Sequence, residues 1–229
     1  MQIFAREACT ISHRLADVSV LRYTPAVPSE VLRPAGGMTA KGHVDLMSHQ
    51  LRAIRAALAL AYSLDRMLVL PPIWCGYDKY WAPLSDAGVI PGAHDWVLPI
   101  GNCPLDHMFN PSELKPSPAA YVREYSFLDN PRLPSSHRQA AVRTAIDLDG
   151  GDREWRRLHE LAGAPVLDVT NLYSSAAEMW RRQAVLQPRH WKLFRKRFAN
   201  FQGGWCCAPR RDKLNGGPHA AGFHLLNTK

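Results

Sequence analysis

Residues 43–72 read HVDLMSHQLRAIRAALALAYSLDRMLVLPP, and this stretch decides the fold class. Its first part repeats apolar side chains at intervals of three and four residues, which predicts an alanine-rich helix that packs closely against a sheet. Met67–Leu70 is then an apolar run too short for a helix and bounded by Pro71 and Pro72, which predicts a buried strand. A helix, a two-residue turn and a buried strand form the unit that builds parallel sheets.

Further elements of the same kind are predicted downstream. Residues 145–148 are predicted as a strand, residues 152–161 as a helix and residues 165–169 as the next strand. The expected fold is therefore α/β, with a Rossmann-like parallel sheet flanked by helices.

Two more helix starts are indicated near the end of this region. Ser175 and Glu178 have the spacing of a capping box for a helix that runs past Trp180. Pro188 suits the first turn of a final helix, which is basic on its remaining faces. The apolar stripe of that helix consists of Trp191, Phe194, Phe198 and Phe201.

Composition and charge limit the classes of protein to which this chain can belong. The chain has 229 residues, of which 46% are hydrophobic, enough for one substantial core or two small ones. Its net charge of +8 is spread along the chain without a recognisable nucleic-acid-binding motif, so nucleic acid is not an expected partner. No run approaches the roughly 20 apolar residues of a membrane span, and residues 1–10 lack the features of a signal peptide.

The expected domain organisation has three parts. Residues 1–40 are rich in proline and glycine and are expected to be an irregular lead-in, in which only Val18–Tyr23 is typical of a strand. Residues 41–207 are expected to form the α/β domain. Residues 208–229 are expected to be a flexible tail.

The segment Pro71–Pro83 follows a predicted strand, where ligands of open α/β sheets bind. It gathers aromatic rings around Asp78, a combination that suits sugar recognition because rings stack on CH groups and carboxylates accept hydroxyl hydrogen bonds. Aromatic residues that simply fill the core are the alternative. The rings belong to Trp74, Tyr77, Tyr80 and Trp81.

Other polar pairs have weaker signals. Asp106 next to His107 could supply a general base, and Arg123 next to Glu124 could contact a phosphate. Structural ion pairs use the same residue types more often. His49 and Gln50 lie in the first turns of the predicted helix, where an anion could be bound.

Asp147-Leu-Asp149 has the D-x-D pattern that can hold Mg²⁺ or Mn²⁺. It is followed by Gly150, Gly151 and Asp152, which are typical of a strand end, a turn and a helix start. We favour this structural interpretation, and no metal site is assigned within the chain.

Several blocks together resemble the plant extensin arabinosyltransferases, nucleotide-diphospho-sugar transferases of glycosyltransferase family 77. The resemblance covers about Val44 to Cys207 and is weaker between Arg138 and Pro188. A shorter likeness, over His49–Pro71, connects the chain to protein O-fucosyltransferases. The blocks that carry the main resemblance are His49–Ala59, Leu64–Arg66, Leu68–Pro71, Trp74–Pro83, Cys103–Phe109, Arg123–Pro131, Phe194–Phe198 and Trp205–Cys207.

The resemblance implies a Golgi-lumenal enzyme that transfers L-arabinose from a UDP-sugar to arabinosides on hydroxyproline-rich glycoproteins. It also implies that the membrane anchor and the D-x-D motif for Mn²⁺ or Mg²⁺ lie upstream, so that this chain carries an incomplete glycosyltransferase fold. On this hypothesis Asp78, Asp106 and His107 are catalytic. The substrate-binding residues are then Trp74, Tyr80, Trp81, His49, Gln50, Arg123 and Glu124.

A secretory location would also make disulfides plausible. Cys75 with Cys103 is the first expected pair, and Cys206 or Cys207 is an alternative partner. The alternative function is a truncated, non-catalytic module that binds a glycan or a partner transferase through the aromatic segment.

Overall fold

The computed structural model describes residues 18–35, 40–75, 100–103, 122–139, 141–182, 188–198, 202–208 and 219–224. The chain divides into two compact units, each built from three separate segments. The first unit comprises Met1–Thr24, Ala56–Pro71 and Pro118–Phe194. The second comprises Pro25–Arg55, Pro72–Ser117 and Arg195–Lys229.

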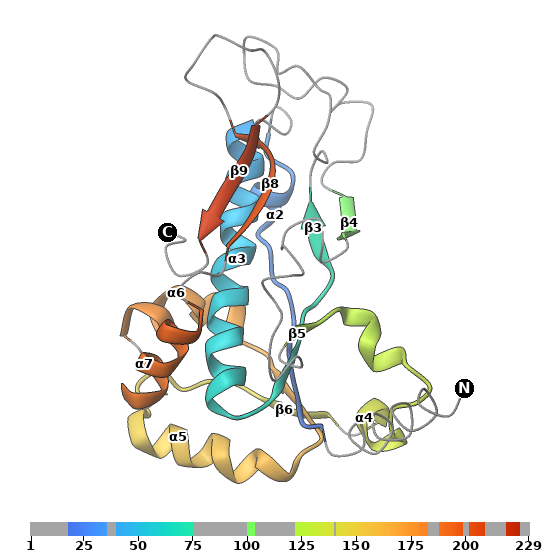
Figure 1. Ribbon diagram of the computed structural model, residues 1–229, viewed down its shortest axis with the longest axis vertical. Helices are drawn as coiled ribbons and strands as arrows, with labels where there is room; N and C mark the ends of the chain where they lie inside the picture. Colours follow the sequence, from blue (N-terminus) through green and yellow to red (C-terminus); the bar gives the residue numbers. More distant parts are fainter. Residues whose placement is uncertain are drawn as a thin grey trace, which may run out of the picture. The chain divides into compact units, whose positions relative to one another are not determined.

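A five-stranded parallel sheet organises the first unit (Figure 1). Its strand order is β5-β2-β1-β7-β6, and every neighbouring pair is parallel. The predicted α/β fold with a Rossmann-like parallel sheet is thereby confirmed. The strands are β1 (Val20–Tyr23), β2 (Met67–Val69), β5 (Val122–Arg123), β6 (Ala141–Thr144) and β7 (Val166–Val169).

The central position of β1 creates a topological switch point. The chain leaves β1 for β2 and then β5 on one side, and it later fills the other side with β6 and β7. The direction of strand addition therefore reverses between β1 and β7. In open α/β sheets this reversal marks the place where ligands bind, outside the carboxyl ends of the strands.

Helices cover both faces of this sheet. In Figure 1, α6 (Leu172–Arg182) and α7 (Pro188–Arg197) lie on the same side of the strands as α3 (Ala40–Ser63). Aromatic contacts join these helices, since the Trp180 ring centroid lies 5.0 Å from that of Trp191, and Tyr62 lies 6.0 Å from Phe194. The predicted final helix is confirmed, with Trp191 and Phe194 buried.

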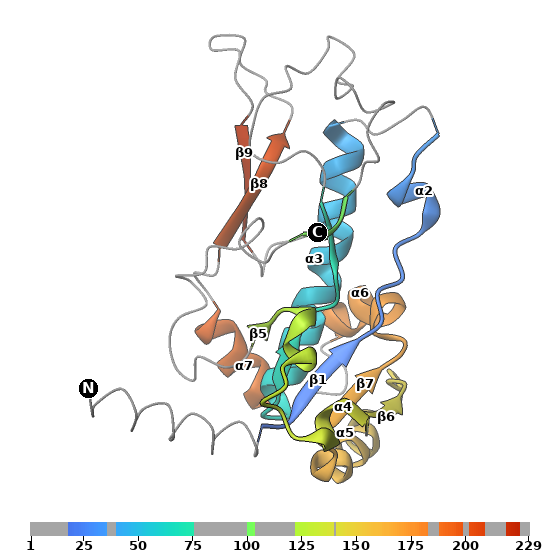
Figure 2. The same cartoon turned by 90° about the vertical axis from the view of Figure 1, so that its right-hand side faces the viewer.

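The opposite face has a smaller apolar cluster, and Figure 2 shows the segment that covers it in front of β1. Phe127 and Leu128 belong to the 3-10 helix η2 (Tyr125–Asp129) and pack against this face together with Val18. The short helix α4 (Ser135–Gln139) follows, and its buried His137 places Nε2 2.6 Å from the carbonyl oxygen of Val18. The sheet residues of the cluster are Val20, Met67, Val69 and Val166.

The turn between α3 and β2 depends on one residue in the left-handed region. Asp65 has a φ of 52°, and the N–H of Arg66 reaches back to the carbonyl of Ala61 at 2.8 Å. This is the hydrogen bond that closes a helix in a Schellman-type ending. Aspartate tolerates the left-handed conformation better than most residues because its short polar side chain can bond locally. The turn leads the chain directly from α3 into the buried strand β2.

Arg66 lies immediately after this turn and is only 2% exposed. Its guanidinium donates hydrogen bonds to the carbonyl oxygens of Val20, Ala164 and Leu161, at 3.1, 2.9 and 2.7 Å. These acceptors belong to β1, to Ala164 between η3 and β7, and to the 3-10 helix η3 (Leu161–Gly163) itself. One buried side chain thus joins three segments at the amino end of the sheet.

Two sequence predictions in this unit were wrong in detail. The strand predicted at residues 145–148 lies four residues earlier, as β6, because the backbone of residues 145–147 is bound by side chains instead. The predicted capping box is also absent, since α6 begins at Leu172 and Ser175 is buried inside it. The predicted helix and strand at 152–161 and 165–169 are confirmed as α5 (Gly151–Glu160) and β7.

The second unit includes short elements and two antiparallel strand pairs. It contains α2 (Ser29–Leu32), the first part of α3, and β3 (Ile73–Cys75) paired with β4 (Ile100–Cys103). A second pair joins β8 (Gln202–Ala208) to β9 (His219–His224). In the part of the chain that the structure describes, no helix has both the length and the hydrophobicity that a bilayer span needs.

Strands lie within both the predicted lead-in and the predicted tail. Val20–Tyr23 was typical of a strand within the predicted lead-in, and it forms the central strand β1. Residues 219–224 fall in the predicted flexible tail and form β9. The sequence therefore indicated the strand at Val20–Tyr23 but not the strand at residues 219–224.

Candidate functional site

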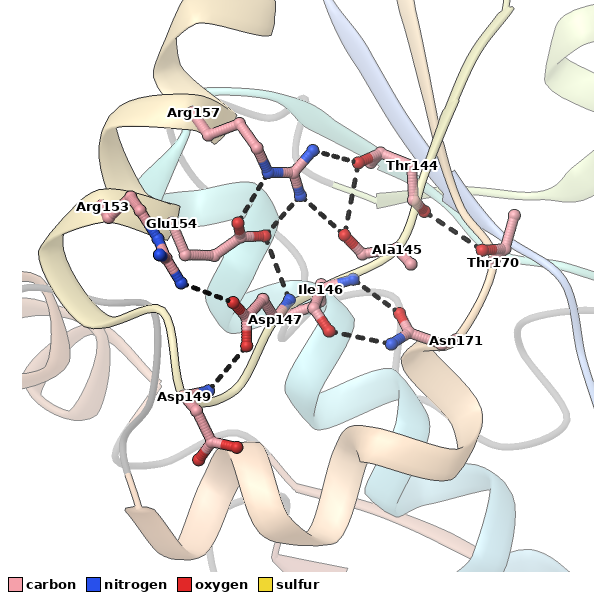
Figure 3. A network of polar contacts seen from close by, with 10 residues as sticks. All are labelled: Thr144, Ala145, Ile146, Asp147, Asp149, Arg153, Glu154, Arg157, Thr170 and Asn171. Atoms are coloured by element: carbon pink, nitrogen blue, oxygen red, sulfur yellow. Dashed lines mark hydrogen bonds and ion pairs between the residues drawn. The ribbon is translucent and has the colours of Figure 1, made fainter.

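A polar network follows the carboxyl ends of β6 and β7, and Figure 3 shows its ten residues. Arg157, from α5, lies at its centre. Its Nη1 donates to Thr144 Oγ1 at 2.7 Å and its Nη2 to the carbonyl oxygen of Ala145 at 2.6 Å. Its Nε also donates to Glu154 Oε2 at 2.6 Å, and this charged hydrogen bond is the main reason that the pKa of Arg157 is raised.

Asn171 holds the segment after β6 from the other side. Its side-chain oxygen accepts a hydrogen bond from the N–H of Ile146 at 2.8 Å, and its Nδ2 donates to the carbonyl of the same residue at 2.9 Å. The amide therefore makes the two hydrogen bonds that a neighbouring strand would make, although residue 146 lies beyond the end of β6. Glu154 adds a third contact by accepting from the N–H of Asp147 at 3.2 Å.

The D-x-D carboxylates have the contacts of a turn and of surface ion pairs. Asp147 Oδ1 accepts from the N–H of Asp149 at 3.0 Å, and its Oδ2 pairs with Arg153 at 3.1 Å. Asp149 accepts from Arg182 of α6 at 2.6 Å. The part of the chain that the structure describes contains no group of three side chains suited to hold a metal ion. These contacts support the structural interpretation of Asp147 and Asp149.

In the second unit, Gln50 fixes the start of the aromatic segment. Its side-chain oxygen accepts from the N–H of Trp74 at 2.8 Å, and its Nε2 donates to the carbonyl of Trp74 at 2.7 Å. Gln50 is buried, so both bonds are sheltered from water. These contacts give Gln50 a positioning role toward Trp74, while direct substrate binding by Gln50 stays a prediction.

The Trp74 ring lies beside β4. A Cβ atom added to Gly101 would lie 3.0 Å from the ring, which is closer than ordinary packing allows. Glycine at position 101 therefore leaves room for the indole on the neighbouring strand. Trp74 itself is only partly buried, so its ring is not wholly used in the core.

His49 and Arg123 each contact a nearby side chain. The Nδ1 of His49 lies 3.4 Å from a guanidinium nitrogen of Arg52, and burial and then this arginine lower the pKa of His49. Arg123 ends β5 with its guanidinium 5.9 Å from the ring centroid of Phe127, within the range of a cation–π contact. The carbonyl of Glu124 accepts from the N–H of Phe127 at 2.9 Å and so begins η2. Phosphate or substrate binding by these three residues stays a prediction.

Five predicted site residues lie outside the described residues, so their catalytic and binding roles stay predictions. The backbone of Cys75 and Cys103 is described, on paired antiparallel strands. The register places Cys103 opposite Ile73 and Cys75 opposite Ile100. Cys206 and Cys207 lie on β8, and all the disulfide pairings stay predictions. The five site residues are Asp78, Tyr80, Trp81, Asp106 and His107.

Comparison with known proteins gives one informative match. Arabinosyltransferase XEG113 of Arabidopsis thaliana is 38% identical to this chain over 137 residues, which cover 57% of the chain. This chain resembles an arabinosyltransferase. The match covers 20% of the length of that relative, so the chain spans about a fifth of it. No protein-family model matches the chain, and no solved structure matches it significantly.

Sequence reasoning did not find a cluster of three charged side chains at the switch point. Arg22 of β1 donates to Asp168 of β7 at 3.1 Å, and Arg143 of β6 lies on the other side of the same carboxylate. The available signal was a charged residue inside each of two apolar strands, VLRY and VLDV. A charge in the middle of a strand that is otherwise buried needs a partner, and the partner here lies on the adjacent strand.

Proposed function

We propose that this chain is part of a glycosyltransferase and that it transfers, or helps to transfer, L-arabinose from a UDP-sugar to arabinosides of hydroxyproline-rich glycoproteins. The observation that carries the proposal is the 38% identity to an arabinosyltransferase over more than half of this chain. At that identity two segments of this length share a fold and, in many cases, a chemistry. The proposal places the protein in the Golgi lumen.

The arrangement of the described residues supports this proposal in two ways. A Rossmann-like parallel sheet is the kind of scaffold on which nucleotide ligands bind at strand ends. The buried amide of Gln50 also holds the backbone of Trp74 in place, at the start of the segment that carries the predicted sugar-binding rings. Rigid placement of an aromatic residue suits a sugar-binding role, because stacking depends on ring orientation.

Within this function Asp78 is the proposed carboxylate for sugar hydroxyls, with Asp106 and His107 as base or supporting pair. Arg123 is the proposed diphosphate contact, since it ends a strand of the sheet and a guanidinium can bind phosphate in a bidentate manner. Divalent metal, where the reaction uses it, is proposed to bind outside this chain.

The test measures binding and turnover of UDP-arabinose with the chain expressed in an oxidising host. The acceptor is an arabinosylated hydroxyproline peptide. We expect Asp78→Ala to reduce kcat/KM by about tenfold or more, the range for loss of a hydrogen bond to a charged group. Asp129→Ala is the matched control because Asp129 is an exposed carboxylate on η2. Equal activity of the two variants would remove the role assigned to Asp78.

A second candidate function is a non-catalytic module that binds the glycan acceptor through the aromatic segment. The partial exposure of Trp74 favours it as strongly as it favours an enzyme. The two candidates differ in the same assay. The non-catalytic module is identified by two results together. The chain binds the acceptor and loses this binding in Trp74→Ala, and it shows no turnover, either alone or joined to the upstream region that the resemblance predicts to carry the D-x-D motif.

A further inference from the structure

Three charged side chains form a row across the sheet of the first unit. The register places Arg22 of β1 opposite Asp168 of β7, and Asp168 opposite Arg143 of β6. Residues opposite one another on parallel strands point to the same face, so the three side chains lie side by side. The Nη2 of Arg22 is 3.1 Å from Asp168 Oδ2, and the Nε of Arg143 is 3.7 Å from the same oxygen.

The second oxygen of this carboxylate has no donor. The Asp168 side chain is only 5% exposed, and its Oδ1 is buried without a hydrogen-bond partner among the residues that the structure describes. Burial removes the hydration of a carboxylate oxygen, and an oxygen that gains no donor in exchange is unfavourable. Asp168 is therefore prepared to accept a hydrogen bond from a group that the sheet itself does not supply.

The two arginines remain accessible on either side of it. The Arg22 side chain is 38% exposed and that of Arg143 is 77% exposed. Each guanidinium has five N–H donors, and their contacts to Asp168 occupy few of them. Two cations and one anion leave the row positively charged, which favours a negatively charged ligand.

The position of the row also indicates a ligand. Arg22 and Asp168 are the next-to-last residues of β1 and β7, the two strands between which the order of the sheet reverses. Ligands of open α/β sheets bind at this point of the fold.

We propose that Arg22, Asp168 and Arg143 form a binding site for a small sugar phosphate. The phosphate pairs with the guanidinium groups of Arg22 and Arg143, which match its geometry. A sugar hydroxyl next to the phosphate donates to Asp168 Oδ1. Arg143 is the more exposed of the two arginines and meets the phosphate from the solvent side. The assignment does not rest on the proposed transferase activity, and it concerns a different set of residues.

The test compares two phosphate monoesters by isothermal titration calorimetry with the full chain. Ribose 5-phosphate carries hydroxyl donors, and methyl phosphate carries none. At pH 8 and equal ionic strength both are dianions, so their difference in affinity reports the hydroxyl contacts. We expect the chain to bind ribose 5-phosphate about tenfold more tightly, the range of one hydrogen bond to a charged group.

Variants separate the two contacts. Asp168→Asn keeps the shape of the side chain and should reduce the preference for ribose 5-phosphate to about twofold or less, while methyl phosphate binds more tightly because both arginines are released. Arg143→Gln should weaken both ligands by about tenfold. Arg156→Gln removes an exposed arginine of α5 and is the matched control, expected to change neither affinity.

Thermal unfolding establishes that each variant is folded before its affinity is compared. Arg143 is the most exposed member of the row, so Arg143→Gln should fold. This variant therefore tests the proposal even if Asp168→Asn does not fold. The proposal is wrong if the chain binds neither ester, or binds both equally. It is also wrong if Arg143→Gln binds as the unaltered chain does, because the row is then a structural ion pair. Transferase activity enters none of these outcomes.

Discussion

Arg66 shows how much of the fold depends on a single side chain. It is buried and donates to three backbone carbonyl oxygens that lie up to 98 residues from it in sequence. Burial lowers the pKa of Arg66, and the guanidinium of an arginine still stays charged in a protein. We expect Arg66→Met to lower the free energy of unfolding by about 3 kcal/mol, because buried acceptors lose a charged donor.

Urea denaturation followed by tryptophan fluorescence measures this change. The free energy of unfolding of Arg66→Lys should lie between those of Arg66→Met and the unaltered chain. The single ammonium of lysine cannot reach all three oxygens in the arginine geometry. Arg132→Met alters an exposed arginine and should be within about 0.5 kcal/mol of the unaltered chain. An equally small effect at position 66 would show that the three carbonyls find other donors.

At the scale of elements, Asn171 defines how β6, the loop after it and α6 join. Its amide binds both polar backbone groups of Ile146. We expect Asn171→Ala to cost about 2 kcal/mol, the range for two sheltered hydrogen bonds, and to expose the N–H of Ile146 to exchange. Asn171→Asp keeps the acceptor but loses the donor, so it should retain protection of that N–H. Native-state hydrogen exchange at Ile146 checks both, and unchanged exchange in the alanine variant would contradict the assigned contact.

The same elements show what the sequence could and could not predict. Helix α3 and strand β2 could be predicted from their own apolar patterns. A long run with helical periodicity indicates a helix with one buried face, and a short apolar run indicates a buried strand. The end of β6 could not be predicted in this way, since Arg157 and Asn171 bind the backbone polar groups of residues 145 and 146 from 12 and 25 positions further along the chain. Tertiary contacts of this kind leave no local pattern.

The candidate site divides in the same way. Arg123 was singled out because it lies next to Glu124, and the structure places it at the end of β5, while its phosphate contact stays a prediction. The sequence did not reveal the row of Arg22, Asp168 and Arg143, because strand order decides which strands are neighbours. Paired residues of β1 and β7 are 146 positions apart in sequence. A charged residue within an apolar strand predicts a partner but does not identify it.

At the scale of the whole molecule, two histidines should make stability depend on pH. Burial and then Arg52 lower the pKa of His49 from 6.5, against smaller opposing effects of Ala26 and Glu30. Burial, then Arg189 and His159, lower the pKa of His190, whose ring lies 5.1 Å from that of Trp155. Both groups stay neutral in the folded chain at pH values where the unfolded chain already binds protons.

The sign of the effect follows from this difference in proton binding. Above pH 6.5 both states are neutral at these positions, and the two histidines do not affect the slope of stability against pH. As the pH falls from 6.5 toward the lowered pKa values, the unfolded state takes up protons that the folded state refuses, so stability decreases. We expect the urea midpoint to fall between pH 7 and pH 5, and to fall less in the double variant His49→Gln, His190→Gln. Arg156→Gln leaves both histidine environments intact and should follow the unaltered chain. Parallel curves for the double variant and the unaltered chain would show that the acid sensitivity comes from other groups.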